Sequence, residues 1–228
     1  MSTLLLLGSA PMAMQASVWS RKGFDKIAAI NNAYRIRPDW DYAIYPWDFP
    51  SERHPVAGEG QRLVTEDEFV PAQNAYGGFV YAGATMAYTA AYWALSQLRP
   101  KVIAVFGCDM HYPAGEQTHF YGQGSPDPLR ADITLRDLEA KSARLMILAA
   151  MQGCAMVNLS KGPSRLLFPR GDVGSARLPD FDATKAKAAL AREAELGYVS
   201  ASGRYWEELH RFDVAEIDAL DAMWRAAL

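Results

Sequence analysis

Cysteine is scarce in this chain: two residues, Cys108 and Cys154, in 228. Each directly follows a glycine in an apolar setting, so we expect small core residues in a reducing, cytoplasmic location rather than a disulfide. No cluster of His, Cys and carboxylate residues has the spacing of metal ligands. The sequence therefore predicts no disulfide framework and no metal site, and no cofactor is expected.

Strong charge of one sign and long apolar runs are also lacking. Lys and Arg number 23 against 26 Asp and Glu, a formal net charge of −3, so nothing in the overall charge favours nucleic acid as a partner. No run approaches the roughly 20 apolar residues of a membrane span. The run Leu4 to Leu7 is short and has no basic segment before it. We therefore expect residues 1–16 to form a first strand and its loop, not a secretory signal.

The sequence does contain short apolar runs that alternate with helix-like segments. Predicted strands cover residues 3–7, 26–30, 42–45, 102–106 and 155–159, and predicted helices cover 12–19, 81–98, 135–151, 183–196 and 206–228. This alternation predicts an α/β fold: a Rossmann-like, doubly wound, mainly parallel sheet with helices on both faces. We expect a nucleotide-binding domain over residues 1–171 and a helical extension packed on it over 172–228.

Some segments carry more specific expectations. Segment 69–71 is expected to be a short edge element, and the aromatic residues of 81–98 are expected in the core. Arg144 falls off the apolar face of its predicted helix, so we expect it to be solvated. The apolar face of the last helix, with Ile217 and Trp224, fits packing on the core or on a partner chain equally well, so a homo-oligomer stays possible.

Small and amide residues recur where the predicted strands end. They are Gly8-Ser9-Ala10, Asn31-Asn32, Gly107-Cys108-Asp109 and the segment 158–160. The carboxyl ends of parallel strands share one edge of a sheet, where ligands bind. Backbone N–H groups at the Gly8 turn suit a phosphate, and Asn side chains both donate and accept hydrogen bonds. The sequence has neither the Gly-x-Gly-x-x-Gly fingerprint nor the phosphate-binding Gly-x-x-x-x-Gly-Lys-Ser/Thr loop.

Titratable side chains gather after the strand 102–106. Asp109 ends that strand, and His111 and His119 lie eight residues apart in the loop that follows. A loop His near an Asp can act as a general base with an orienting carboxylate, and its ordinary pKa of ~6.5 suits that role. The alternatives are a turn-forming Asp109, surface His residues, and a His pair that forms part of a metal site. Four cations near this edge could neutralise a phosphate or carboxylate: Arg130, Lys161, Arg165 and Arg170.

Six short motifs along the first 170 residues carry a resemblance. They are Gly8-Ser9-Ala10-Pro11-Met12, Asn32-Ala33-Tyr34, Ala82-Gly83-Ala84-Thr85, Gly107-Cys108-Asp109-Met110-His111-Tyr112, His119-Phe120-Tyr121-Gly122-Gln123 and Gly162-Pro163-Ser164-Arg165-Leu166-Leu167. In this order they resemble motifs of the bacterial sialyltransferases that decorate lipooligosaccharide. They are also similar to the wider group of MptE-like hydroxymethylpterin diphosphokinases and motility-associated glycosyltransferase-like proteins.

The resemblance implies that the chain binds a nucleotide-activated sugar, most readily a CMP-sugar, and transfers it to a glycan or small hydroxyl acceptor. It implies His119 as general base with Asp109 as the second catalytic residue. The implied nucleotide-binding residues are Gly8, Ser9, Ala10, Asn31, Asn32, Gly83, Ala84, Gly107, His111, Tyr112, Tyr121, Gln123 and Ser164.

The chain departs from the sialyltransferase pattern at five places. Only Tyr112 lies near the expected tyrosine pair, with Gln117-Thr118 where the second tyrosine would fall, and the segment between Asp109 and His119 is much shorter than in those enzymes. Ser9 or Ala10 stands where the first-strand Asn is expected, Gln123 stands at the base position, and Pro46-Trp47-Asp48 follows the third strand. Two alternatives to sialyl transfer therefore stay open. One is a diphosphotransferase that uses ATP and Mg²⁺, and the other is a non-catalytic ligand-binding protein on the same fold.

Overall fold

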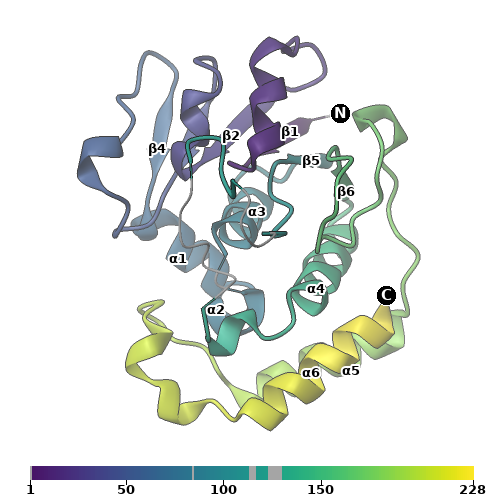
Figure 1. The fold of residues 1–228 in the computed structure, drawn as a ribbon. Helices are drawn as coiled ribbons and strands as arrows, with labels where there is room; N and C mark the ends of the chain where they lie inside the picture. The colour runs from purple at the N-terminus through teal and green to yellow at the C-terminus, as the bar shows by residue number, and fades with distance from the viewer. Residues whose placement is uncertain (1, 84, 113–116, 123–129) are drawn as a thin grey trace.

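A six-stranded sheet forms the centre of the computed structural model, which describes residues 2–83, 85–112, 117–122 and 130–228 (Figure 1). The strands are β1 (Thr3–Leu7), β2 (Lys26–Ile30), β3 (Tyr42–Ile44), β4 (Arg62–Val64), β5 (Val102–Phe106) and β6 (Ala155–Asn158). Their order is β4-β3-β2-β1-β5-β6, and every neighbouring pair is parallel. The predicted α/β, Rossmann-like fold is confirmed.

The helices are of two kinds. The α-helices are α1 (Glu66–Asn74), α2 (Phe79–Ala82), α3 (Met86–Gln97), α4 (Leu138–Met151), α5 (Ala183–Leu196) and α6 (Val214–Ala227). The 3₁₀ helices are η1 (Pro11–Val18), η2 (Asn31–Arg35), η3 (Ser51–Arg53), η5 (Ile133–Leu135), η6 (Val173–Ser175), η7 (Tyr205–Glu207) and η8 (Leu209–Arg211). None of the helices in the described part of the chain has the length and apolarity needed to cross a membrane.

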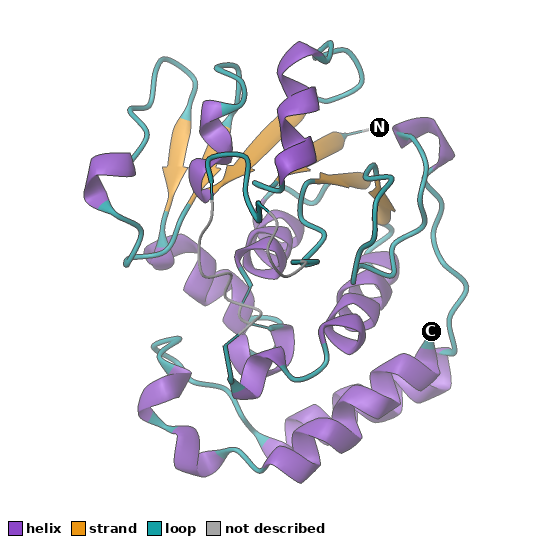
Figure 2. Ribbon diagram, in the orientation of Figure 1, coloured by secondary structure: helices purple, strands orange, loops and turns teal. Residues whose placement is uncertain are grey.

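The two faces of the sheet are covered differently (Figure 2). In β1, Leu4 and Leu6 face a large core built with α1, α2, α3 and α4, while Leu5 and Leu7 face a smaller core built with η1 and η2. Every residue of β1 is buried, as expected for a parallel strand covered on both sides. The predicted helix 12–19 is present as the 3₁₀ helix η1, and its Ala13 and Ala16 pack into the smaller core.

A helical pair, α5 and α6, lies beyond α4 on the side away from the sheet (Figure 1). Ile217, Leu220 and Trp224 of α6 are buried in the same core as α4, so the apolar face of the last helix packs on its own chain. Arg144 of α4 is 1% exposed and pairs with Glu193 of α5, with 2.7 Å between Nε and Oε1. The prediction that Arg144 is solvated is therefore wrong, because a carboxylate from α5 compensates its buried charge.

Three other expectations need correction. The predicted helix 81–98 is broken: α2 ends at Ala82, Gly83 has φ +89°, and the Thr85 hydroxyl caps α3. Segment 69–71 is part of α1, a helix with three acidic residues in its first turn that favour its N-terminus, and not an edge element. The final predicted helix, 206–228, is α6 preceded by η7 and η8. The aromatic residues Tyr88, Tyr92 and Trp93 are in the core, as predicted.

Candidate functional site

The strand order places a topological switch point between β1 and β5. From β1 the chain proceeds through β2, β3 and β4 on one side, then crosses to β5 on the other side of β1. In open parallel sheets, ligands bind outside the carboxyl ends of the strands at such a point. The strand ends that the sequence singled out, at Gly8, Asn31, Gly107 and Asn158, therefore lie along one edge of the sheet.

The ends of β1 and β5 lie directly against each other. The Gly8 amide donates to the Phe106 carbonyl (2.8 Å), and the Ala10 amide donates to the Gly107 carbonyl (3.0 Å). Gly107 has φ +73°, and a Cβ there would lie 2.7 Å from the Ala13 Cβ, so this approach requires glycine. These two amides are occupied by β5 carbonyls and do not serve as phosphate donors.

A buried polar network joins the ends of β5 and β6. Asp109 is 5% exposed, and its Oδ1 accepts a hydrogen bond from Asn158 Nδ2 (3.2 Å). The same Asn158 amide lies 3.2 Å from Ser164 Oγ, while Asn158 Oδ1 accepts from the Ser160 amide (2.9 Å). Ser160 Oγ in turn accepts from the Gly107 amide (3.3 Å). Asp109 and Ser164, two predicted site residues, are thus held together by Asn158, whose side chain contacts Asp109, Ser160 and Ser164.

Three buried oxygen atoms at this edge have no hydrogen-bond partner among the described residues: Asn31 Oδ1, Asn32 Oδ1 and Asp109 Oδ2. Asn31 has φ +49°, which places these two residues in the turn that closes β2. A buried polar atom left unpaired costs about 1–3 kcal/mol, and more if it is charged. β1 separates β2 from β5, and strand spacing makes that separation roughly 10 Å. Each of these atoms is an acceptor for a hydroxyl or amino group.

The His119 turn docks on the end of β1. The Phe120 amide donates to the Ser9 carbonyl (3.0 Å), and the His119 and Gly122 backbones exchange two hydrogen bonds of 3.1 Å. Burial lowers the pKa of His119 below its usual 6.5, so the imidazole is neutral at pH 7. Its Nδ1 lies 2.9 Å from Thr118 Oγ1.

Aromatic rings surround this imidazole. The ring of Tyr121 stacks on His119 with 4.9 Å between centroids, and the Tyr112 ring lies at 6.1 Å. The structure therefore brings together Tyr112, His119 and Tyr121, with Ser9 beside their turn. A neutral imidazole can accept a proton from a hydroxyl group.

Other predicted residues lie elsewhere or outside the description. His111 is exposed, and Gly83 belongs to helix packing, because its carbonyl accepts from Gln73 Nε2 (3.0 Å) and a Cβ there would lie 3.0 Å from the Tyr88 ring. Ala84 and Gln123 lie outside the described residues.

The four predicted cations divide into two groups. Arg170 donates to the Ser160 carbonyl (2.6 Å), and the Arg165 amide donates to the Asp109 carbonyl (2.9 Å), so both belong to the loop after β6. Lys161 is exposed in the same loop. Arg130 instead lies near the C-terminal segment, where its Nη2 donates to Tyr205 OH (3.0 Å). Asn158 and Ser160 complete the network, although neither is among the predicted site residues; the sequence indicates segment 158–160 only as the end of a predicted strand.

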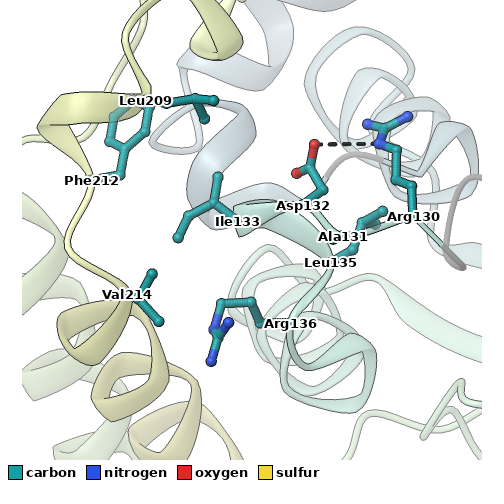
Figure 3. A pocket seen from close by; sticks show the side chains of 9 residues that line it. All are labelled: Arg130, Ala131, Asp132, Ile133, Leu135, Arg136, Leu209, Phe212 and Val214. Carbon is teal, nitrogen blue, oxygen red and sulfur yellow. Dashed lines mark hydrogen bonds and ion pairs between the residues drawn. The ribbon is translucent and has the colours of Figure 1, made fainter.

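A separate cleft of about 430 Å³ opens where residues 130–136 face residues 209–214 (Figure 3). Ile133, Leu209 and Phe212 form apolar walls, whereas the Arg130 guanidinium is turned onto Asp132. None of the residues that line this cleft belongs to the buried polar network of Gly107, Asp109, Asn158, Ser160 and Ser164, called here the strand-end network.

Among residues 2–83, 85–112, 117–122 and 130–228, no group of three or more His, Cys, Asp or Glu side chains is placed to hold a metal ion. Comparison of the chain with models of protein families, with curated proteins and with solved structures finds no match.

Proposed function

We propose that the carboxyl edge of β2, β1 and β5 binds a nucleotide-activated sugar, most readily a CMP-sugar, and that the protein transfers the sugar to a hydroxyl acceptor. One observation carries the proposal: three buried acceptor atoms at the carboxyl edge of the parallel sheet, Asn31 Oδ1, Asn32 Oδ1 and Asp109 Oδ2, have no partner among the described residues.

The chemistry of these atoms favours a ligand rich in hydrogen-bond donors. The exocyclic amine of cytosine donates, whereas uracil presents an acceptor oxygen at the same position. Ribose and sugar hydroxyl groups add further donors. A carboxylate such as Asp109 repels phosphate, so the phosphate would lie toward the loop after β6, where Lys161, Arg165 and Arg170 supply positive charge.

His119 supplies the base in this proposal. Its neutral imidazole takes the proton from the acceptor hydroxyl as that oxygen bonds to the anomeric carbon of the donor sugar. The bond between the anomeric carbon and the phosphate oxygen breaks, and its electron pair leaves with the nucleotide. Asp109, positioned by Asn158, accepts hydrogen bonds from the nucleotide-activated sugar. The six motifs similar to sialyltransferase motifs point to the same chemistry.

Thermal-shift measurements with CMP, UMP, GMP and AMP, and with ATP plus Mg²⁺, test the binding step. A ligand at 100 times its dissociation constant adds about 2.7 kcal/mol, or about 5–11 °C for a chain of this size. We expect CMP to raise Tm more than UMP. Asn32→Ala should abolish the shift, whereas Asn74→Ala, which removes an unpartnered amide oxygen far from this edge, should preserve it.

Each other outcome points to a different function. No shift with any nucleotide would refute the binding site. A shift only with ATP and Mg²⁺ would favour a diphosphotransferase. A CMP shift without hydrolysis or transfer of a CMP-sugar, unchanged in His119→Ala, would leave a ligand-binding protein without catalysis.

A further inference from the structure

A second cavity lies at the same edge of the sheet, at the ends of β3 and β4. Its volume is about 550 Å³, and its walls come from segment 46–48, the first turn of α1, α2 and segment 202–206. β3 pairs with β2, so this cavity is displaced by one strand from Asn31 and Asn32 and shares no lining residue with the strand-end network.

Aromatic side chains dominate the cavity. Trp47 is 67% exposed and Trp206 is 45% exposed, and both line it. Tyr205 lies deeper, with its ring 5.4 Å from Trp206 and 6.2 Å from Phe79. Phe69 adds a further buried ring to the wall. Two large indoles that stay accessible around a concave surface form a platform for a ligand and add little to the core.

The two arginines of the wall are already compensated. The Arg130 Nε lies 3.3 Å from Asp132 Oδ2, and Tyr205 OH donates to the same carboxylate oxygen at 2.8 Å. Burial is the main reason that the pKa of Tyr205 rises to about 12, so this hydroxyl keeps its proton. Arg204 pairs with Glu207 at 3.4 Å.

Two carboxylates of the wall are not compensated. Asp48 and Glu66 form no ion pair with any residue that the structure describes. Glu66 is the first residue of α1. The lining therefore carries three carboxylates against two guanidinium groups, a formal charge of −1.

We propose that this cavity binds a small organic cation, a quaternary ammonium or an alkylamine. The cation would lie against the indole faces of Trp47 and Trp206, because aromatic rings attract cations within about 6 Å of their centroids. Asp48 and Glu66 would supply the counter-charge. An anionic ligand would find both guanidinium groups occupied and both free carboxylates opposing it. The inference does not depend on nucleotide binding at the neighbouring edge.

Choline and its uncharged isostere 3,3-dimethylbutan-1-ol test the proposal, because the two have nearly the same shape and differ in charge. We expect titration calorimetry of the full chain to show choline binding at least about fivefold tighter than the isostere. Ethanolamine extends the test to a primary amine. Raising the salt concentration should weaken choline binding and leave the isostere unaffected.

Single substitutions locate the site. Trp47→Ala and Asp48→Asn should each weaken choline binding at least about fivefold, since one removes an aromatic face and the other a counter-charge. Both side chains are exposed, so Tm should stay within about 2 °C of the parent value. Glu52→Gln, which removes an exposed carboxylate outside the cavity, is the matched control and should leave binding unchanged.

Three results would overturn the inference. Equal affinity for choline and the isostere would make the cavity a site for neutral apolar ligands. Choline binding that survives in both Trp47→Ala and Asp48→Asn would place the cation elsewhere. If choline at about 50 mM, roughly 50 times a millimolar dissociation constant, shows no binding, the cavity is not a cation site.

Discussion

Two buried aspartates provide a direct test of whether Asp109 serves a ligand or the fold. Asp109 is 5% exposed and Asp221 is 2% exposed, and each has an Oδ2 without a hydrogen-bond partner among the described residues. Their other oxygens differ. Asp221 Oδ1 lies 2.9 Å from the buried Lys141 ammonium, whereas Asp109 Oδ1 accepts, among the described side chains, only from the neutral amide of Asn158. We expect Asp109→Asn and Asp221→Asn to change stability in opposite directions.

The magnitudes follow from the charge that each substitution leaves behind. Asp221→Asn leaves the Lys141 ammonium buried without a counter-ion, which costs about 3–5 kcal/mol. For a chain of this size that lowers Tm by about 6–20 °C. Asp109→Asn removes a buried charge that no cation compensates in the described network, and we expect a gain of about 1 kcal/mol, or about 2–4 °C.

Urea unfolding at pH 7, followed by far-UV circular dichroism, measures both effects as differences in the free energy of unfolding. A variant that folds normally keeps the parent m-value, so a change in midpoint alone reports stability. The thermal-shift panel is then repeated with Asp109→Asn. A site residue should lose the nucleotide-induced shift while the unliganded protein becomes more stable, the usual opposition between function and stability.

The opposite result is equally clear. If Asp109→Asn destabilises the protein by more than about 1 kcal/mol, the carboxylate is a structural partner of Asn158 and the open lone pair has no functional meaning. If Asp221→Asn costs less than about 1 kcal/mol, the reasoning from buried counter-charges fails for both residues.

Three further predictions concern stability and pH. Arg144→Met should lower the free energy of unfolding in urea by about 3–5 kcal/mol, because it leaves the buried Glu193 carboxylate without its counter-ion. Arg192→Met, at an exposed ion pair, should lower it by at most about 1 kcal/mol. Gly107→Ala should lower Tm by several degrees more than Gly153→Ala. Both glycines have positive φ, but a Cβ at Gly107 would lie 2.7 Å from the Ala13 Cβ, whereas a Cβ at Gly153 would lie 3.9 Å from its nearest neighbour, Lys101 Nζ. The pKa of His119 is lowered in the folded protein, so the unfolded chain binds this proton more tightly. The free energy of unfolding should therefore fall as the pH drops below 6.5. His119→Gln should make this fall less steep, as measured by urea denaturation at several pH values.

The fold was largely accessible from the sequence because each strand of the buried centre is a continuous apolar run. β1, β2 and β5 match their predicted bounds. β4 could not be predicted, because Arg62-Leu63-Val64 is short and begins with an exposed Arg. The break after Ala82 was hidden for a different reason: the residues on both sides are apolar, and only the φ of Gly83 and the Thr85 cap reveal it.

The sequence indicated which edge of the sheet carries the candidate site, but not the contacts within it. Strand ends at Asn31, Gly107 and Asp109 indicated the edge, since parallel strands share it. The partners of these residues depend on contacts across long sequence separations, such as Asn158 with Asp109. Arg144 shows the same limit in the core, because its carboxylate partner is 49 residues away, and no helical periodicity of α4 predicts that pairing.

The two buried ion pairs also determine how the chain can be divided. Arg144 and Lys141 lie on α4 beneath the sheet, while their counter-charges, Glu193 and Asp221, come from the last fifty residues. A chain cut after residue 171 would keep all six strands but expose the apolar side of α4 and leave the two cations without their counter-ions. The C-terminal helices are therefore not a detachable appendage. Fusion partners or tags belong at exposed loops such as 56–60, and a chain shortened from its C-terminal end should aggregate.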